Sequence, residues 1–331
     1  MELVTVNHIE DQLISEEEVL VSNGNFIEAN TQQVSLHHLK TECIIPTYND
    51  SESTIPHSQF IEATKEVVEV SFPGVTVLQP NVRVSHVIKG RVASAMGKAV
   101  KELTPEEKTI FHQRLAFIIE LPTLKENVNS NSLSLVVGGV RALNQENLYS
   151  KRSLEKFKVF IGYKNFVCTN LCVSTDGLMA EIRVSSVAEL REKVSELISS
   201  FDKDRMLGNM ERMNRFHLNE LQFAHTIGKM KLYQYLNKKE KVGKLSLLMN
   251  DNQIGTLVKN YYQDENFSRS TDREINLWSF YNLMTDANKS SYIDSNLERN
   301  VNAFEFISGI ANAMQNQEEN WFLDPTVYDN I

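Results

Sequence analysis

The sequence predicts an α+β fold, in which an antiparallel sheet of about four to five strands packs against a long helix and precedes a mainly helical C-terminal part. Three observations carry this prediction. Strand-like apolar runs occupy residues 114–121, 133–142 and 157–163. Apolar residues at helical spacing follow over 186–201. The same helical spacing then dominates the chain from residue 205 onward.

Composition and turn signals divide the chain into three expected domains. Residues 1–58 contain the run Glu16-Glu17-Glu18 and the breaker-rich segment PTYNDSESTIP, which predict an acidic, loosely structured N-terminal arm. Residues 59–204 hold the strands and the long helix and form the expected α+β domain. Residues 205–331 form the expected helical C-terminal region.

The first expected elements of the α+β domain are a helix from about Ser58 to Pro73, a strand over 81–91 with a basic end, and a short helix to about His112. Thr104, a proline and Glu107 give that short helix a capping-box start. Gly138-Gly139 in the run LSLVVGGVRA indicates a bulge or a close backbone approach.

The next elements are a hairpin and the long helix. FKVFIGY and FVCTNLCV flank Lys164-Asn165 and predict the two strands of the hairpin. Ser186 with Glu189 has the capping-box pattern that starts the long helix. Farther on, Asn219 is the expected cap of one C-terminal helix, and Thr271 with Glu274 is the expected start of another.

Composition also limits the compartment. No run of about 18 uncharged apolar residues occurs, so no membrane span is expected. The start, MELVTVNHIEDQ, lacks a basic segment followed by an apolar one, so no secretory signal is expected. Three cysteines are too few for a disulfide scaffold and fit a reducing cytoplasm.

Searches for catalytic and cofactor motifs find nothing. The chain has no phosphate-binding loop, no dinucleotide fingerprint, no H-E-x-x-H, no G-x-S-x-G and no C-x-x-C. Cys168 and Cys172, about 13 Å apart on an extended strand, are too distant to bind one zinc ion. We therefore expect no cofactor, no metal site and no catalytic residue, which favours a protein without enzymatic activity.

Charge is distributed unevenly along this acidic chain, whose net charge is −9. Residues 1–80 contain 13 Asp/Glu and 2 Lys/Arg, whereas residues 81–170 contain 14 Lys/Arg and 7 Asp/Glu. Such a basic segment predicts a surface that attracts anionic partners.

Residues 156–164 alternate within the basic segment. Phe157, Val159, Ile161 and Tyr163 share the face expected to be core, and the other face carries lysines with an aromatic ring between them. Sites for single-stranded nucleic acid combine cations that contact phosphates with aromatic rings on which bases stack. The candidate nucleic-acid-binding residues are Lys156, Lys158, Phe160, Lys164, Lys151, Arg152, Arg141, Lys89 and Arg91. In the alternative reading, helices or a partner subunit cover Phe160 and the lysines only aid solubility.

Five long motifs carry a resemblance to a known family: RVSHVIKGR, LSLVVGGVRALNQENLYSK, FKVFIGYKNFVCTNLCVSTDG, LNELQFAHTIGKMKLYQYL and INLWSFYNLMTDANKSSYIDSNLERNVNAFEF. Over about residues 26–310 the chain resembles an uncharacterised Bacteroidetes family found on mobile elements, a domain of unknown function. That resemblance implies no catalytic residues.

The chain is also distantly similar to the phage/plasmid-like proteins. Two elements carry this similarity: Val167-Cys168-Thr169-Asn170, and the later set Trp278, Asn282 and Thr285. Lys289-Ser290-Ser291 stands where that family has a histidine after the threonine element. The order of strands followed by a helix is similar in outline to that of phage single-strand annealing proteins.

Together, these patterns predict a cytoplasmic, mobile-element-associated protein that binds single-stranded DNA and has an accessory role in strand annealing or recombination. Its expected partners are single-stranded DNA and further copies of itself as a homo-oligomer, with no membrane partner. The acidic arm is expected to compete with DNA for the basic face. The alternative is a protein-interaction or assembly module that binds no nucleic acid, which the overall acidity favours.

Overall fold

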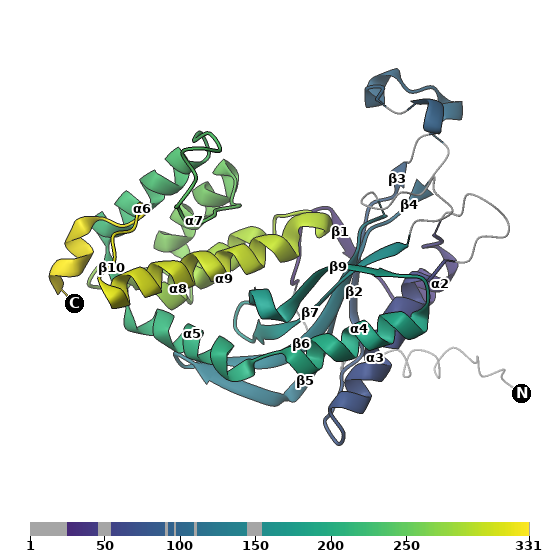
Figure 1. The fold of residues 1–331 in the computed structure, drawn as a ribbon, viewed down its shortest axis with the longest axis horizontal. Coiled ribbons are helices and arrows are strands. Elements are labelled where there is room, and N and C mark those ends of the chain that lie inside the picture. The colour runs from purple at the N-terminus through teal and green to yellow at the C-terminus, as the bar shows by residue number, and fades with distance from the viewer. Residues whose placement is uncertain are drawn as a thin grey trace, which may run out of the picture.

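The computed structural model describes residues 25–45, 54–89, 92–95, 97–108, 111–143 and 154–330. Its centre is a seven-stranded antiparallel sheet in the order β1-β2-β5-β6-β7-β8, with β9 also paired to β7. The strands of this sheet are β1 (Thr31–Gln33), β2 (Asn81–Ser85), β5 (Leu115–Val128), β6 (Asn131–Arg141), β7 (Glu155–Asn165), β8 (Leu171–Cys172) and β9 (Leu178–Val184). Figure 1 shows the sheet between layers of helices.

Two helices cover one face of the sheet. α3 (His57–Ser71) and α4 (Val187–Ser200) lie next to each other on this face and contact β6 and β7. Apolar side chains from both helices and from alternate strand positions form one continuous core. Its centre is aromatic: the ring of Phe60 on α3 packs edge-on against Phe117 and Phe157, at centroid distances of 5.0 and 4.7 Å.

A different layer covers the opposite face. The start of α9 (Ile293–Asn316) contributes Ile293 and Leu297, and the N-terminal segment contributes Phe26 and Ile27. These four side chains pack on alternate residues of the central strands, including Phe160. Both faces of the sheet are therefore buried in its middle.

Four further helices and most of α9 form the C-terminal part. They are α5 (Lys203–Arg215), α6 (Glu220–Tyr233), α7 (Asp251–Gln263) and α8 (Leu277–Asn288), together with α9. A small ribbon of β10 (His217–Asn219) and β11 (Glu274–Asn276) joins α5, α6 and α8. Another two-stranded ribbon pairs β3 (Ile88–Lys89) with β4 (Phe111–His112). No helix in the described part of the chain is long and apolar enough to span a membrane.

The predicted fold class is confirmed, since an antiparallel sheet packed by a long helix precedes a helical region, but the sheet has more strands than expected. One additional strand, β1, lies in the predicted arm. Within residues 25–45, β1 pairs with β2, α2 (Leu36–Thr41) follows, and Phe26 is buried, so this part of the arm belongs to the sheet. Residues 1–24 and 46–53 of the predicted arm lie outside the described residues.

Local signals predicted several helix starts correctly. Ser186 accepts a hydrogen bond from the Glu189 amide at the start of α4, and Asn219 caps α6 with a full capping box. The Thr104 capping box is also present, but it opens only a 3₁₀ turn over Pro105–Glu107. The expected start at Thr271 is wrong, because residues 274–276 form β11 and Asn276 caps α8 instead.

Candidate nucleic-acid interface

β7 has the two faces that the sequence predicts, and its core face is confirmed. Phe157, Val159, Ile161 and Tyr163 are buried in the core beneath α3 and α4. The hairpin with β8 also forms, but β8 begins only at Leu171, so Val167 and Cys168 lie in the turn and not in a strand.

The expectation that Phe160 lies on an exposed face is wrong. Its side chain is only 1% exposed, because Ile293 and Leu297 of α9 cover this face of the sheet. A ring covered in this way cannot receive a stacked base in this conformation. The alternative reading, in which a helix covers Phe160, is therefore the one that the structure supports.

Each of the three β7 lysines has an acidic partner. Lys156 Nζ donates to Glu181 Oε1 on β9 at 2.6 Å. Lys158, which is buried, donates to the Glu298 carboxylate and to the Asp294 carbonyl (2.8 Å), both on α9.

Lys164 is also buried and pairs with Glu120 on β5, which accepts a second hydrogen bond from Ser134 Oγ at 2.7 Å. The β7 lysines thus neutralise carboxylates of the sheet and of α9, and two of the three are sequestered from solvent.

Of the remaining predicted residues, the structure describes only the side chain of Arg141, and this side chain is buried. Arg141 is 1% exposed, donates to the Glu155 carboxylate and to the Ile55 carbonyl, and stacks on the Phe157 ring. Lys89 contributes its backbone to β3, and its side chain lies outside what the structure describes. Arg91, Lys151 and Arg152 lie outside the described residues, so their part in nucleic-acid binding stays a prediction.

A different part of the chain gathers exposed and half-buried lysines near aromatic rings. Residues 229–244, KMKLYQYLNKKEKVGK, contain six lysines and one glutamate and span the end of α6 and the turns after it. We call this the lysine-rich surface; it comprises Lys229, Lys231, Lys238, Lys239, Lys241 and Lys244 with Tyr235 and Trp321. It lies on the side of the molecule away from α3 and α4 (Figure 1).

Cation–π contacts organise this surface. Lys229 and Lys244 lie over the Trp321 ring, with Nζ atoms 4.6 and 5.5 Å from its centroid. Lys241 lies 4.6 Å from the Tyr233 ring centroid. The C-terminal residues fold back to place Trp321 here, since the rings of Trp321 and the buried Phe322 lie 6.4 and 5.5 Å from that of Tyr233 at the end of α6. Cations and rings are therefore held together by tertiary contacts as well as by sequence.

Several groups on this surface are free to meet a ligand. Tyr235 is 84% exposed. Among the described residues, Lys238 and Lys239 are exposed and form no ion pair, whereas Lys231 pairs with Asp251 at 3.1 Å. The sequence analysis predicts no site here, because over residues 171–331 the 23 Asp/Glu outnumber the 18 Lys/Arg and conceal the local cluster. A 16-residue window would have found it.

The segment Val167–Asn170 and the helix that carries Trp278, Asn282 and Thr285, which the sequence singled out, contact each other in the structure. Asn282 on α8 accepts a hydrogen bond from Asn165 Nδ2 (3.2 Å) at its side-chain oxygen and from Asn170 Nδ2 (2.9 Å) at its carbonyl. Lys289 Nζ donates to the Cys168 carbonyl at 2.5 Å and to Asp286 at 3.0 Å. This buried polar junction fixes the β7–β8 turn against the C-terminal helices.

The described residues contain no reactive cysteine and no group of side chains that could bind a metal ion. Burial raises the pKa of the Cys168 thiol to about 12 and that of Cys43 to about 11, so neither is a ready thiolate nucleophile. Desolvation likewise raises the pKa of Cys172. No group of three or more His, Cys, Asp or Glu side chains in the described part of the chain could hold a metal ion.

Comparison with known families matches residues 8–323 to a family described as "Domain of unknown function, B. Theta Gene description (DUF3871)". The chain belongs to this family. No curated protein and no solved structure matches it. The lysine-rich surface and the polar junction described above both fall within the matched residues.

Proposed function

We propose that the protein binds single-stranded nucleic acid through the lysine-rich surface. One observation carries the proposal: Lys238 and Lys239, which are exposed and form no ion pair within the described part of the chain, follow closely after the 84% exposed Tyr235, and two further lysines lie over the Trp321 ring. Lysines contact phosphates, and each base stacked on an aromatic ring contributes about 1–3 kcal/mol without selecting a sequence. These are the lysine–phosphate contacts and base stacking that the sequence predicts for β7, but they are now proposed for the lysine-rich surface.

The overall acidity of the chain does not oppose this proposal. At 0.15 M ionic strength charges farther apart than about 8 Å are largely screened, so a local cationic surface attracts phosphates even on an acidic protein. The finer biological role, as an annealing or recombination accessory of a mobile element, is part of the same proposal and rests on the sequence resemblance.

Fluorescence anisotropy of a labelled single-stranded oligonucleotide tests the proposal. Tyr235→Ala should weaken binding by about 5- to 150-fold, the equivalent of one lost stack of about 1–3 kcal/mol. Lys238→Glu with Lys239→Glu should weaken binding further. Because each phosphate contact on a single strand adds about 0.7 to the slope of log affinity against log salt, loss of two contacts should reduce that slope by about 1.4.

The matched control is Lys101→Glu with Lys108→Glu, which makes the same change of net charge in the segment 97–108, far from the lysine-rich surface (Figure 1). This variant should bind like the wild type. Equal losses in both pairs of variants would show that only net charge matters, and unchanged binding in the Tyr235 and Lys238/Lys239 variants would contradict the proposal.

A further inference from the structure

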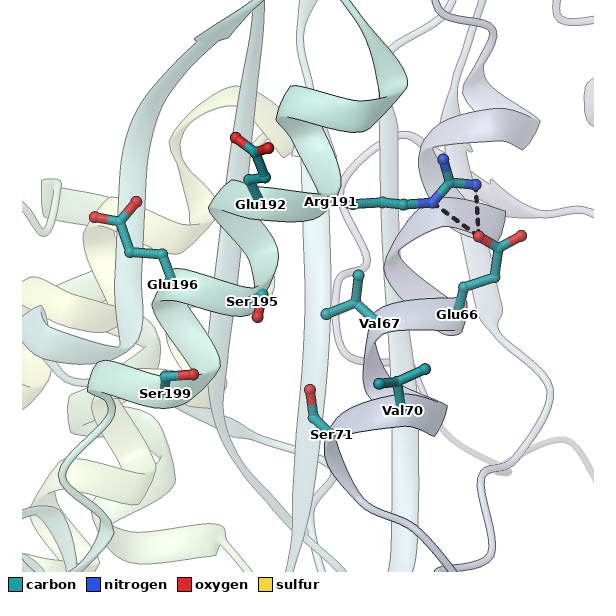
Figure 2. A pocket seen from close by; sticks show the side chains of 9 residues that line it. All are labelled: Glu66, Val67, Val70, Ser71, Arg191, Glu192, Ser195, Glu196 and Ser199. Atoms are coloured by element: carbon teal, nitrogen blue, oxygen red, sulfur yellow. Dashed lines mark hydrogen bonds and ion pairs between the residues drawn. The ribbon is translucent and has the colours of Figure 1, made fainter.

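An open groove separates α3 from α4 on the outer side of the sheet. Residues of both helices line it, and its volume is about 600 Å³. Figure 2 shows these side chains, with Arg191 on α4 reaching across to Glu66 on α3. At Ser71 and Ser199 the groove meets a second hollow of about 390 Å³, whose lining includes Leu135 and Ile161 of the sheet.

The groove combines an apolar interior with an acidic border. Val67 and Val70 of α3 give it apolar surface, and Val70 is 81% exposed. Ser195 and Ser199 are small and leave room for an inserted side chain. Glu192 and Glu196 lie along α4 at the groove. Glu196 pairs with Lys193 of the same helix and Glu66 pairs with Arg191, so the border keeps an excess of carboxylate over cationic side chains. An occupant should therefore present apolar side chains between basic ones.

The lysine-rich surface has this composition. Among its lysines stand three exposed apolar or aromatic side chains: Leu232 (58% exposed), Tyr235 and Val242 (78% exposed). Such exposed apolar groups lose solvent contact favourably in a groove, at about 25 cal/mol per Å² buried. The lysine-rich surface is thus complementary to the α3–α4 groove: its lysines match the carboxylates of the border, and its apolar side chains match the apolar interior.

These two surfaces lie on different sides of the molecule, so one copy cannot bring them together within itself (Figure 1). Contact between them requires two copies, with the lysine-rich surface of one in the groove of the next. Because the two surfaces differ, the contact is heterologous, and repetition gives a ring or an open chain of copies.

We propose that the α3–α4 groove binds the lysine-rich surface of a second copy, so that the protein assembles head to tail. The contact extends beyond the proposed nucleic-acid binding, since it needs the groove, which has no part in that function. It uses some of the same lysines, so a second copy and nucleic acid compete for them.

Sedimentation velocity of nucleic-acid-free protein tests this proposal. The wild type should form oligomers at low ionic strength that dissociate when salt is raised, because the contact is partly electrostatic. Glu192→Lys with Glu196→Lys should be monomeric, and so should Lys238→Glu with Lys239→Glu. All four positions are exposed, so folding should be unaffected, as circular dichroism can verify.

The decisive arm mixes the two variants. The basic groove of the Glu192→Lys, Glu196→Lys variant should bind the acidic surface of the Lys238→Glu, Lys239→Glu variant. The unchanged groove of the latter should bind the unchanged lysine-rich surface of the former. An equimolar mixture should therefore regain wild-type assembly. Ser195→Trp, which fills the groove without a charge change, should be monomeric. At a salt concentration at which the wild type is also monomeric, the two proteins should bind an oligonucleotide equally tightly.

Three results would overturn the proposal. The wild type could stay monomeric, which would leave another protein as the occupant of the groove. The charge-reversed variants could still assemble on their own, or their equimolar mixture could fail to assemble. The proposed function fails separately, since it is tested by oligonucleotide affinity. Loss of that affinity in Lys238→Glu with Lys239→Glu, but not in the groove variants, supports nucleic-acid binding whether or not the protein assembles.

Discussion

Lys164 and Glu120 form a buried ion pair between residues 44 positions apart, on β7 and β5. The alternation of residues 156–164 assigns Lys164 to the polar face of the strand, and lysines are rarely buried. Its burial depends on a carboxylate at a distant position, which local periodicity does not reveal. The same holds for Lys158, whose partner Glu298 lies 140 positions away.

Lys164→Met should therefore lower the free energy of unfolding and leave the affinity of the folded protein for an oligonucleotide unchanged. Removal of one partner leaves the Glu120 charge buried and uncompensated, which should lower the free energy of unfolding by about 3–5 kcal/mol. Lys164→Met with Glu120→Met should recover much of this loss, because no unpaired charge remains. Urea denaturation measures both.

The control is Lys125→Met, an exposed lysine on β5 whose ammonium lies 5.1 Å from the Phe166 ring centroid. This change should alter the free energy of unfolding by less than about 1 kcal/mol. If Lys164→Met kept full stability but lost oligonucleotide affinity, Lys164 would be a nucleic-acid contact, as the sequence alone predicted.

At the scale of elements, Gly138 and Gly139 of β6 show why the sheet packs closely on both faces. A Cβ atom on Gly138 would lie 2.3 Å from the Phe117 carbonyl oxygen and 2.7 Å from the Phe160 ring. A Cβ atom on Gly139 would lie 2.4 Å from the Phe60 ring. The close approach indicated by the Gly-Gly pair is confirmed, with the Phe160 ring packed on Gly138 and the Phe60 and Phe117 rings packed on Gly139.

Gly138→Ala should destabilise the protein by about 1–3 kcal/mol or more, since the added methyl meets backbone and a buried ring. Gly208→Ala on α5 is the matched comparison, because the space around Gly208 is open. It should stabilise the protein by about 0.5–1 kcal/mol, as expected for alanine in a helix interior. Thermal unfolding of the two variants should shift in opposite directions; parallel shifts would contradict this packing.

The elements that sequence predicts best are those specified locally. α4 and α6 begin at capping residues that bond their own first turn, so a few adjacent residues determine them. β1 escapes prediction because it depends on pairing with β2, far along the chain, and β9 because it pairs with β7 and not with β8, the strand that precedes it. β5 continues to Val128 past Pro122, which reads as a strand end but lies at the register shift between Leu121 and Lys125.

For the molecule as a whole, charge is arranged in space differently from its arrangement along the chain. The basic segment 81–170 contributes lysines and arginines to internal ion pairs, such as Lys164 with Glu120 and Arg141 with Glu155. Within the residues that the structure describes, an exposed cationic surface lies instead in the otherwise acidic C-terminal region. Its lysines could be predicted from the sequence over a short window, but the approach of Trp321 to them, and the groove on the opposite side, depend on tertiary packing.

The measurement that tests the central claim most directly is ultraviolet crosslinking of the full chain to a single-stranded oligonucleotide, with the linked peptides identified by mass spectrometry. Stacked aromatic residues crosslink to bases, so the account predicts links at Tyr235 and Trp321, and their loss in Lys238→Glu with Lys239→Glu. Links confined to the β7 segment 155–165, or none at all, would contradict it.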